Sequence, residues 1–194
     1  MRKRRHALVV RALCSVVFCL LVGALPAGAT QILLQTPSEM GELSELVVQG
    51  RVSEVRSFWN ASGTKILTEV RVEILESHKG FARNSVRIVQ LGGEVDGVRM
   101  SVAGRLSWHA GEEVLVFLDE MKDENFRVAG FSQGKYLVEH DARTGESFVR
   151  RPALIDTELM AQAGMAAPKT ANQELRIPLQ SFLAESLPQY REED

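Results

Sequence analysis

Residues 130–134, Gly-Phe-Ser-Gln-Gly, match the G-x-S-x-G pattern in which a serine acts as a nucleophile. This chemistry requires a strand, a sharp turn that exposes the serine and a following helix, with an acid and a histidine later in the chain. Residues 135–138 instead have the pattern of another strand, and His140 follows Ser132 by only eight residues. We therefore interpret the pentapeptide as a glycine-flanked turn or bulge, and keep a small serine hydrolase using Ser132 as one alternative for function.

Three histidines and one acidic segment are the remaining groups that could bind a metal ion. His78, His109 and His140 are isolated in the sequence, although folding could still bring them together. Residues 119–125 concentrate carboxylates without the alternation and the bidentate glutamate of a calcium loop, so a solvated hairpin loop is expected there. We predict no metal and no cofactor, and leave the three-histidine alternative open.

Two short motifs resemble catalytic or phosphate-binding elements but lack their context. Glu112 and Glu113 could form an acid/base pair, yet adjacent residues on a strand point to opposite faces. Gly92-Gly93 is not followed by the lysine and serine of a phosphate-binding loop, so a turn is expected there. These motifs predict no catalytic residue, and we expect the protein not to be an enzyme.

Aromatic residues next to turns are better candidates, for binding rather than for catalysis. One pair precedes the turn at 60–64 and a second pair precedes Gly111. Exposed aromatic side chains are frequent anchors of protein contacts, whereas packing in the core is the common alternative role. The predicted binding residues are Phe58, Trp59, Lys65, Trp108 and His109.

The elements that must position these residues are short strands. Proline is absent from residues 38–151, and eleven glycines divide residues 50–145 into β-rich pieces. Ile66 to Leu75 alternates apolar and polar residues as a half-buried antiparallel strand does. Further strands are expected at 46–59, 85–91, 98–102, 113–118, 126–129, 136–139 and 147–150.

Two of these strands and the C-terminal segment shape the expected fold. The apolar phase of 46–59 changes near Ser53-Glu54, which predicts a bulge, and residues 114–118 are apolar on both faces, so each face must be covered. After Pro152 the pattern is helical. It predicts a short helix at Thr157–Met165 and a closing helix that contains Leu179, Phe182, Leu183 and Leu187, after Pro178. We expect a mainly β fold, a small antiparallel OB-like Greek-key barrel with a C-terminal helix, with a β-sandwich as the alternative.

The N-terminus has the three parts of a secretory signal peptide: basic residues at 2–6, an apolar stretch at 12–25 and the small residues at 27–29. Both cysteines, Cys14 and Cys19, lie within it, so the mature chain is expected to be free of disulfides. We expect an exported protein, periplasmic or extracellular. The predicted domains are a cleaved signal peptide at 1–29, a lead segment at 30–44, the barrel at 45–151, and a C-terminal helical segment with an acidic tail at 152–194.

Charge separates the N-terminus from the rest of the chain. Five of the 23 basic residues precede residue 30, whereas the first of the 25 acidic residues is Glu39. The remainder has 18 basic and 25 acidic residues, a net charge of −7. Such a domain lacks the positive surface that nucleic acids and anionic membranes require. The expected partner is therefore another protein, such as an exported protease, and neither nucleic acid nor, after cleavage of the signal, a membrane.

The order of several motifs between Val52 and Tyr136 resembles a pattern found in uncharacterised exported bacterial proteins. The motifs are Ile66-Leu67-Thr68, Lys79-Gly80, Gly92-Gly93, Gly111 to Leu118, Gly130 and Gln133 to Tyr136. More distantly, the pattern is similar to the netrin-like and metalloproteinase-inhibitor barrels, which are OB folds. This second resemblance implies a protease-inhibitory or matrix-binding module. Those inhibitors place an N-terminal cysteine on the zinc of the protease, whereas the expected mature chain begins Thr30-Gln31-Ile32 and has no cysteine.

Together these patterns favour an exported, non-enzymatic binding or accessory module of the cell envelope or the extracellular space. A secreted protease inhibitor that uses the loop Trp59–Lys65 or the mature N-terminus is the first alternative. The hydrolase using Ser132 is the second.

Overall fold

The computed structural model describes residues 32–33, 35–81, 84–102, 104–131, 133–151, 159–160 and 176–188. All of them belong to one compact unit that spans Gln31–Asp194. The signal peptide expected at 1–29 lies outside the described residues.

The described chain is mainly β, as expected, and the C-terminal helix is confirmed. Eight strands form one mixed sheet with the order β12–β10–β9–β7–β2–β3–β4–β8. Their bounds are β2 (Leu46–Trp59), β3 (Ile66–Lys79), β4 (Ser85–Leu91), β7 (Glu113–Glu120), β8 (Asn125–Val128), β9 (Lys135–His140), β10 (Ser147–Arg150) and β12 (Arg176–Pro178). Two further pairs are β1 (Ile32–Leu33) with β11 (Leu159–Met160), and β5 (Gly93–Val95) with β6 (Val98–Met100).

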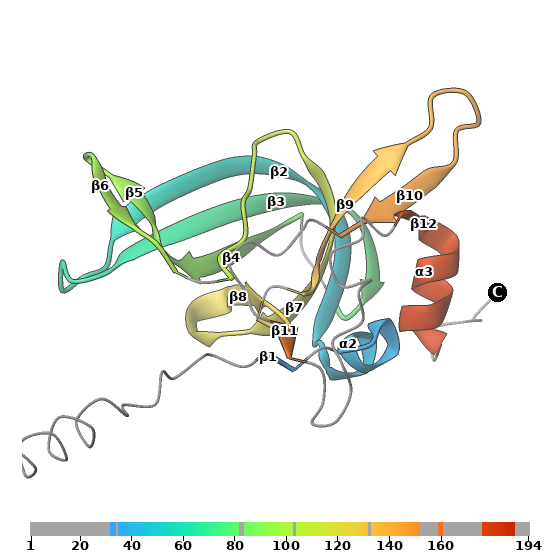
Figure 1. The fold of residues 1–194 in the computed structure, drawn as a ribbon, viewed down its shortest axis with the longest axis horizontal. Coiled ribbons are helices and arrows are strands. Elements are labelled where there is room, and N and C mark those ends of the chain that lie inside the picture. The colour runs from blue at the N-terminus through green and yellow to red at the C-terminus, as the bar shows by residue number, and fades with distance from the viewer. Residues whose placement is uncertain are drawn as a thin grey trace, which may run out of the picture. The chain divides into compact units, whose positions relative to one another are not determined.

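Five strands of the large sheet form a circuit of pairings that we call the strand ring. β7 pairs with β2, β2 with β3, and β3 with β4, all antiparallel. β4 pairs with β8 in parallel, and β8 pairs back to β7. Figure 1 shows β2 and β3 as the long curved ribbons of this ring, with β9, β10 and β12 extending the sheet away from it. A sheet that returns to its first strand has few free edges, which protects it from aggregation.

The hairpin of β2 and β3 is longer than the rest of the strand ring. Each strand has 14 residues, and their register shifts at three places, one of which lies between Val52 and Glu54. The bulge predicted near Ser53-Glu54 is therefore confirmed. β2 pairs with β7 only as far as Arg51, so from Glu54 to Trp59 it pairs with β3 alone. The hairpin consequently ends in a protruding tip.

Two hydrophobic cores meet on β7. Val114, Val116 and Leu118 belong to the first core, which is built from the inward side chains of the strand ring. Leu115 and Phe117 belong to a second core on the other side of the strand, and all five side chains are fully buried. The prediction that both faces of 114–118 are covered is thus confirmed.

Helix α3 (Leu179–Ser186) covers the second core. Phe182 of α3 lies edge-on to Phe117, with 6.1 Å between the ring centroids, and 4.5 Å from the ring centroid of Tyr136. The predicted closing helix is confirmed, and Pro178 is its N-cap residue.

A second short helix, α2 (Pro37–Leu43), lies in a segment for which the sequence analysis predicts no element. Thr36 and Glu39 form a capping box, in which each side chain accepts a hydrogen bond from the backbone nitrogen of the other residue. Gly41 lies against α3 so closely that a Cβ atom there would be 1.7 Å from the carbonyl oxygen of Ser186. Only glycine permits this approach of the two helices.

The helix predicted at Thr157–Met165 is wrong where the structure describes it, because Leu159–Met160 form β11 and pair in parallel with β1. The rest of that segment lies outside the described residues. Within the described ranges, no helix has the length and apolar character needed to span a membrane.

Candidate functional site

The segment between β6 and β7 packs against the first core, and we call residues 104–112 the plug loop. Its side chains alternate: Leu106 and Trp108 are buried in the first core, whereas Ser107 and His109 are exposed. This alternation is that of an extended segment with one face on a core.

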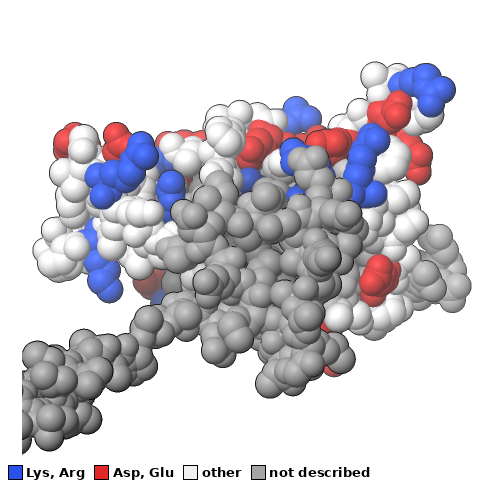
Figure 2. Space-filling view, viewed as in Figure 1, with Lys and Arg blue, Asp and Glu red and all other residues white. Residues whose placement is uncertain are grey.

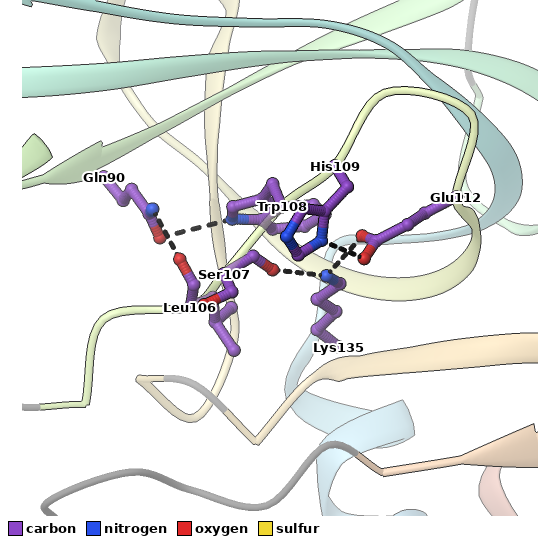
Figure 3. A network of polar contacts seen from close by, with 7 residues as sticks. All are labelled: Gln90, Leu106, Ser107, Trp108, His109, Glu112 and Lys135. Carbon is purple, nitrogen blue, oxygen red and sulfur yellow. Dashed lines mark hydrogen bonds and ion pairs between the residues drawn. The ribbon is translucent and has the colours of Figure 1, made fainter.

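Gln90 of β4 attaches the plug loop to the strand ring. Its Nε2 donates to the carbonyl oxygen of Leu106 (2.9 Å), and its Oε1 accepts from the indole Nε1 of Trp108 (3.3 Å). Figure 3 shows the Trp108 ring between Gln90 and Lys135. The indole is therefore held in place from two sides.

Lys135 of β9 attaches the same loop from the second side. Its side chain is only 2% exposed. Nζ donates to the carbonyl oxygen of Ser107 (2.6 Å) and to Oε2 of Glu112 (2.9 Å), and it lies 4.2 Å from the ring centroid of Trp108. A carbonyl, a carboxylate and an aromatic face thus replace the water that a buried ammonium group loses.

Glu112 compensates the charge of Lys135. Burial by itself would raise the pKa of Glu112, but hydrogen bonds with Lys135 and His109 outweigh it and hold that pKa below the ordinary value. Burial lowers the pKa of Lys135, and the nearby carboxylate of Glu112 opposes this shift. The second oxygen of Glu112 lies 2.6 Å from Nδ1 of His109. The cluster is thus a charged pair whose acidic member also positions an exposed imidazole.

The geometry of this cluster decides what it can do chemically. A nucleophilic lysine must reach its substrate as a free amine, whereas the Lys135 amine is buried and hydrogen-bonded within the protein. A histidine base needs a hydroxyl or thiol about 3 Å away. Among the described residues, the side-chain hydrogen bond of His109 goes to Glu112. The arrangement therefore favours fixation of the plug loop.

The five predicted binding residues fall into two groups. Trp108 and His109 belong to the plug loop, and both line a groove of about 210 Å³ together with Ser57. Trp108 is only 7% exposed, so most of its surface is used in packing. The other three, Phe58, Trp59 and Lys65, lie at the end of the β2–β3 hairpin, and we call them the tip surface.

The tip surface is partly apolar and partly charged. Trp59 is 39% exposed, Phe58 is half-buried and Lys65 is exposed. The guanidinium carbon of Arg56 lies 5.5 Å from the ring centroid of Phe58. The tip therefore presents an exposed indole at Trp59, and a cation lies over the half-buried ring of Phe58.

Ser132 lies outside the described residues, but its neighbours show how the pentapeptide 130–134 is built. Both ends of the connection between β8 and β9 are hydrogen-bonded to the backbone of Phe117. The nitrogen of Ala129 donates to the carbonyl oxygen of Phe117 (2.9 Å), and the nitrogen of Phe117 donates to the carbonyl oxygen of Gly134 (2.8 Å). Gln133 is fully buried and accepts a hydrogen bond from the nitrogen of Gln35 (3.0 Å). β9 begins at Lys135, directly after Gly134, so the described residues show a strand where a nucleophilic serine would require a helix.

The histidines and the paired glutamates have separate partners. Within the described ranges, no three side chains of the metal-binding types come together. Glu112 contacts Lys135, whereas Glu113 accepts from Gln49, so the two glutamates point to different sides, as predicted. The ion pairs of the histidines are His78 with Glu76, His109 with Glu112 and His140 with Glu113.

Gln90 and Lys135 are the site residues that the sequence analysis missed. One signal in the sequence points to Lys135, which directly precedes the apolar residues of a predicted strand. In the structure Lys135 is paired with the fully buried Val116. No protein-family model matches this chain, and no curated protein matches it at a significant level. The indications of function therefore come from the tip surface, the plug loop and the grooves of the molecule.

Proposed function

We propose that the chain is an exported, non-enzymatic binding module whose tip surface contacts another protein. The observation that carries this proposal is the 39% exposure of Trp59 at the end of a hairpin with 14-residue strands. An exposed indole on a protrusion can bury a large apolar area in a partner, and the neighbouring Lys65 supplies a charge for orientation. The signal-like N-terminus supports a place of action outside the cytoplasm.

The loop that carries Lys65 is pre-organised by Asn60. Its Oδ1 accepts from the backbone nitrogens of Thr64 and Lys65 (2.9 Å each), and its Nδ2 donates to the hydroxyl of Ser62 (2.9 Å). The backbone nitrogen of Asn60 also donates to the carbonyl oxygen of Lys65 (2.8 Å). A loop that is already ordered loses less conformational entropy when it binds, which favours affinity.

Two broader features support the proposal. The tip loop joins the first two strands of the strand ring, and in OB-like barrels this loop is one of the usual binding elements. On the face seen in Figure 2, basic and acidic side chains are interspersed over the described surface rather than gathered in one basic field. Such a surface suits a protein partner better than a polyanion.

Photo-crosslinking at the tip tests the proposal in the producing organism. A photoreactive phenylalanine analogue at position 59 of the tagged full chain is expected to give one discrete covalent adduct with another protein. The adduct should be lost when Phe58→Ala and Lys65→Ala are added, and the analogue at position 143, in the β9–β10 turn, serves as the matched control. Equal adducts from positions 59 and 143, or an adduct that survives both substitutions, would contradict the proposal.

A secreted protease inhibitor is the second candidate, and the Asn60-centred loop favours it. An exposed loop with internal hydrogen bonds can occupy a protease cleft and resist cleavage, with Lys65 as the side chain for an acidic specificity pocket. The test is residual activity of trypsin-like proteases at increasing concentrations of the purified protein. Inhibition that disappears in Lys65→Ala supports this candidate, and unchanged protease activity throughout eliminates it.

A further inference from the structure

The strand ring closes through only a short pairing of β4 with β8, beyond which the pairing ends. The two strands are paired only at Arg87 with Asn125 and at Ile88 with Phe126. Beyond this point lies a hollow of about 410 Å³, which we call the seam groove. Its floor is formed by buried Ile88, Leu106 and Val128, and its rim by Leu91, Met121 and Phe131, which are 37%, 43% and 54% exposed. The groove therefore has an apolar floor and an exposed apolar rim.

Phe131 on this rim has an unfavourable backbone conformation. Its φ angle is +70°, in the left-handed region that bulky residues rarely occupy. More than half of the phenylalanine is also exposed to water. Strained backbone conformations cluster at active sites and ligand-binding positions.

The edge of β4 is open along the groove. β4 pairs with β3 as far as Leu91, whereas its pairing with β8 ends at Ile88. Among the described strands, none pairs with Val89–Leu91 on the side away from β3. An open strand edge is a template for another extended chain, which can add to the sheet through backbone hydrogen bonds.

Arg105 supplies a positive charge in the lining of the groove. Its Cδ lies 2.9 Å from the position that a Cβ atom at Gly92 would occupy, so the side chain passes over the residue that follows β4. Asp119, which also lines the groove, forms an ion pair with Arg127 (3.3 Å). Among the described residues, Arg105 has no ion-pair partner. The unpaired charge is complementary to an acidic side chain of a ligand.

We infer that the seam groove binds an extended segment of another protein that carries apolar side chains and one acidic residue. The segment lies along the open edge of β4, its apolar side chains fill the floor between Ile88 and Val128, and its carboxylate pairs with Arg105. Leu91, Met121 and Phe131 close over it from the rim. This inference goes beyond the tip surface, because Leu91 and Arg105 belong to neither the tip nor the Asn60-centred loop.

Selection from a phage-displayed library of random decapeptides on the purified protein tests the inference. We expect the enriched peptides to have apolar residues at alternating positions and to share one acidic residue. A fluorescent synthetic copy of the strongest winner should bind at least about 10-fold more weakly to Leu91→Asp and to Arg105→Gln. The matched controls are Leu75→Asp, at an exposed leucine of β3 outside the groove, and Arg143→Gln, at an exposed arginine of the β9–β10 turn. Thermal unfolding of each variant confirms that it is folded.

Several results would overturn the inference. A library without enriched peptides, or winners that bind Leu91→Asp and Arg105→Gln as tightly as the wild type, would show that the groove is not a peptide site. Two other results would assign the groove to a different occupant. A dimer in sedimentation that Leu91→Asp dissociates would make the occupant a second copy of the chain. Peptide binding that requires deletion of 161–175 would make the occupant that segment of the same chain. Absence of the crosslinked adduct at position 59 leaves the peptide-binding measurements unaffected, so the two proposals can fail separately.

Discussion

Nζ of Lys135 and Oε2 of Glu112 lie 2.9 Å apart, although the two residues are separated by 23 positions in the chain and belong to different elements. The same nitrogen lies over the ring of Trp108, so one buried cation joins β9 to the middle and to the end of the plug loop. A buried ion pair adds little stability relative to apolar residues, but removing one partner leaves an uncompensated charge. Removing Glu112 first and then Lys135 as well therefore separates the effect of an unpaired buried charge from that of the intact pair.

Glu112→Gln is expected to lower the free energy of unfolding by about 3 kcal/mol, because the buried ammonium of Lys135 loses its counter-charge. The double variant Glu112→Gln with Lys135→Met should recover most of this loss, since no unpaired charge remains. Urea unfolding followed by circular dichroism measures both, with the exposed Glu146→Gln as the control. A double variant less stable than Glu112→Gln would mean that Lys135 stabilises the loop by itself, without its counter-charge.

Acid should reduce the contribution of Glu112 to the free energy of unfolding. Its pKa in the folded protein lies below the ordinary value of 4.5, so its stabilising effect is complete above that value and is lost as the pH falls through the folded pKa. The difference in the free energy of unfolding between wild type and Glu112→Gln should therefore be constant near neutral pH and shrink below pH 4.5. Urea titrations at intervals from about pH 7 to pH 3 measure it. A difference that stays constant down to the lowest pH would show that the carboxylate charge is not responsible.

Phe182→Ala is expected to lower the free energy of unfolding by about 3–5 kcal/mol, because it removes a fully buried ring that contacts Phe117 and Tyr136. Gln180→Ala, on the exposed side of α3, should change the stability by less than about 0.5 kcal/mol. Chemical unfolding compares the two. Equal, small effects would mean that α3 contributes little to the second core.

Asn60→Ala should loosen the tip loop, because it removes the side-chain acceptor of the backbone nitrogens of Thr64 and Lys65. Trypsin is then expected to cut after Lys65 about 10-fold faster, as local opening becomes more frequent. The fragments are followed by mass spectrometry, with Ser53→Ala on β2 outside the loop as the control. An unchanged cleavage rate would show that the backbone contacts alone order the loop.

Local pattern is sufficient to predict much of the fold. The strand at 46–59 and its bulge, the alternation from Ile66, and the two-sided burial of 114–118 all follow from the period of apolar residues along the chain. The capping box of Thr36 and Glu39, with Pro37 between them, is an equally local signal for α2. The short helix expected at Thr157–Met165 fails where Leu159–Met160 form a strand, because pairing with a distant segment overrides weak local preference.

The candidate site is less predictable, because it depends on contacts between residues that are far apart in the sequence. Trp108 is recognisable as an aromatic residue next to a turn, but its burial depends on Gln90 and Lys135, which lie on separate strands. The seam groove depends on where the pairing of β4 and β8 ends. No periodicity in either strand records that position.

The two cores also set an order of assembly. The first core uses residues from Leu46 to Val128, whereas the second is completed by Leu179, Phe182 and Leu187. During synthesis the second core therefore lacks its α3 side chains until the C-terminal helix has left the ribosome. The contact of Phe182 with Phe117 and Tyr136 is therefore made only after every strand of the first core has been synthesised.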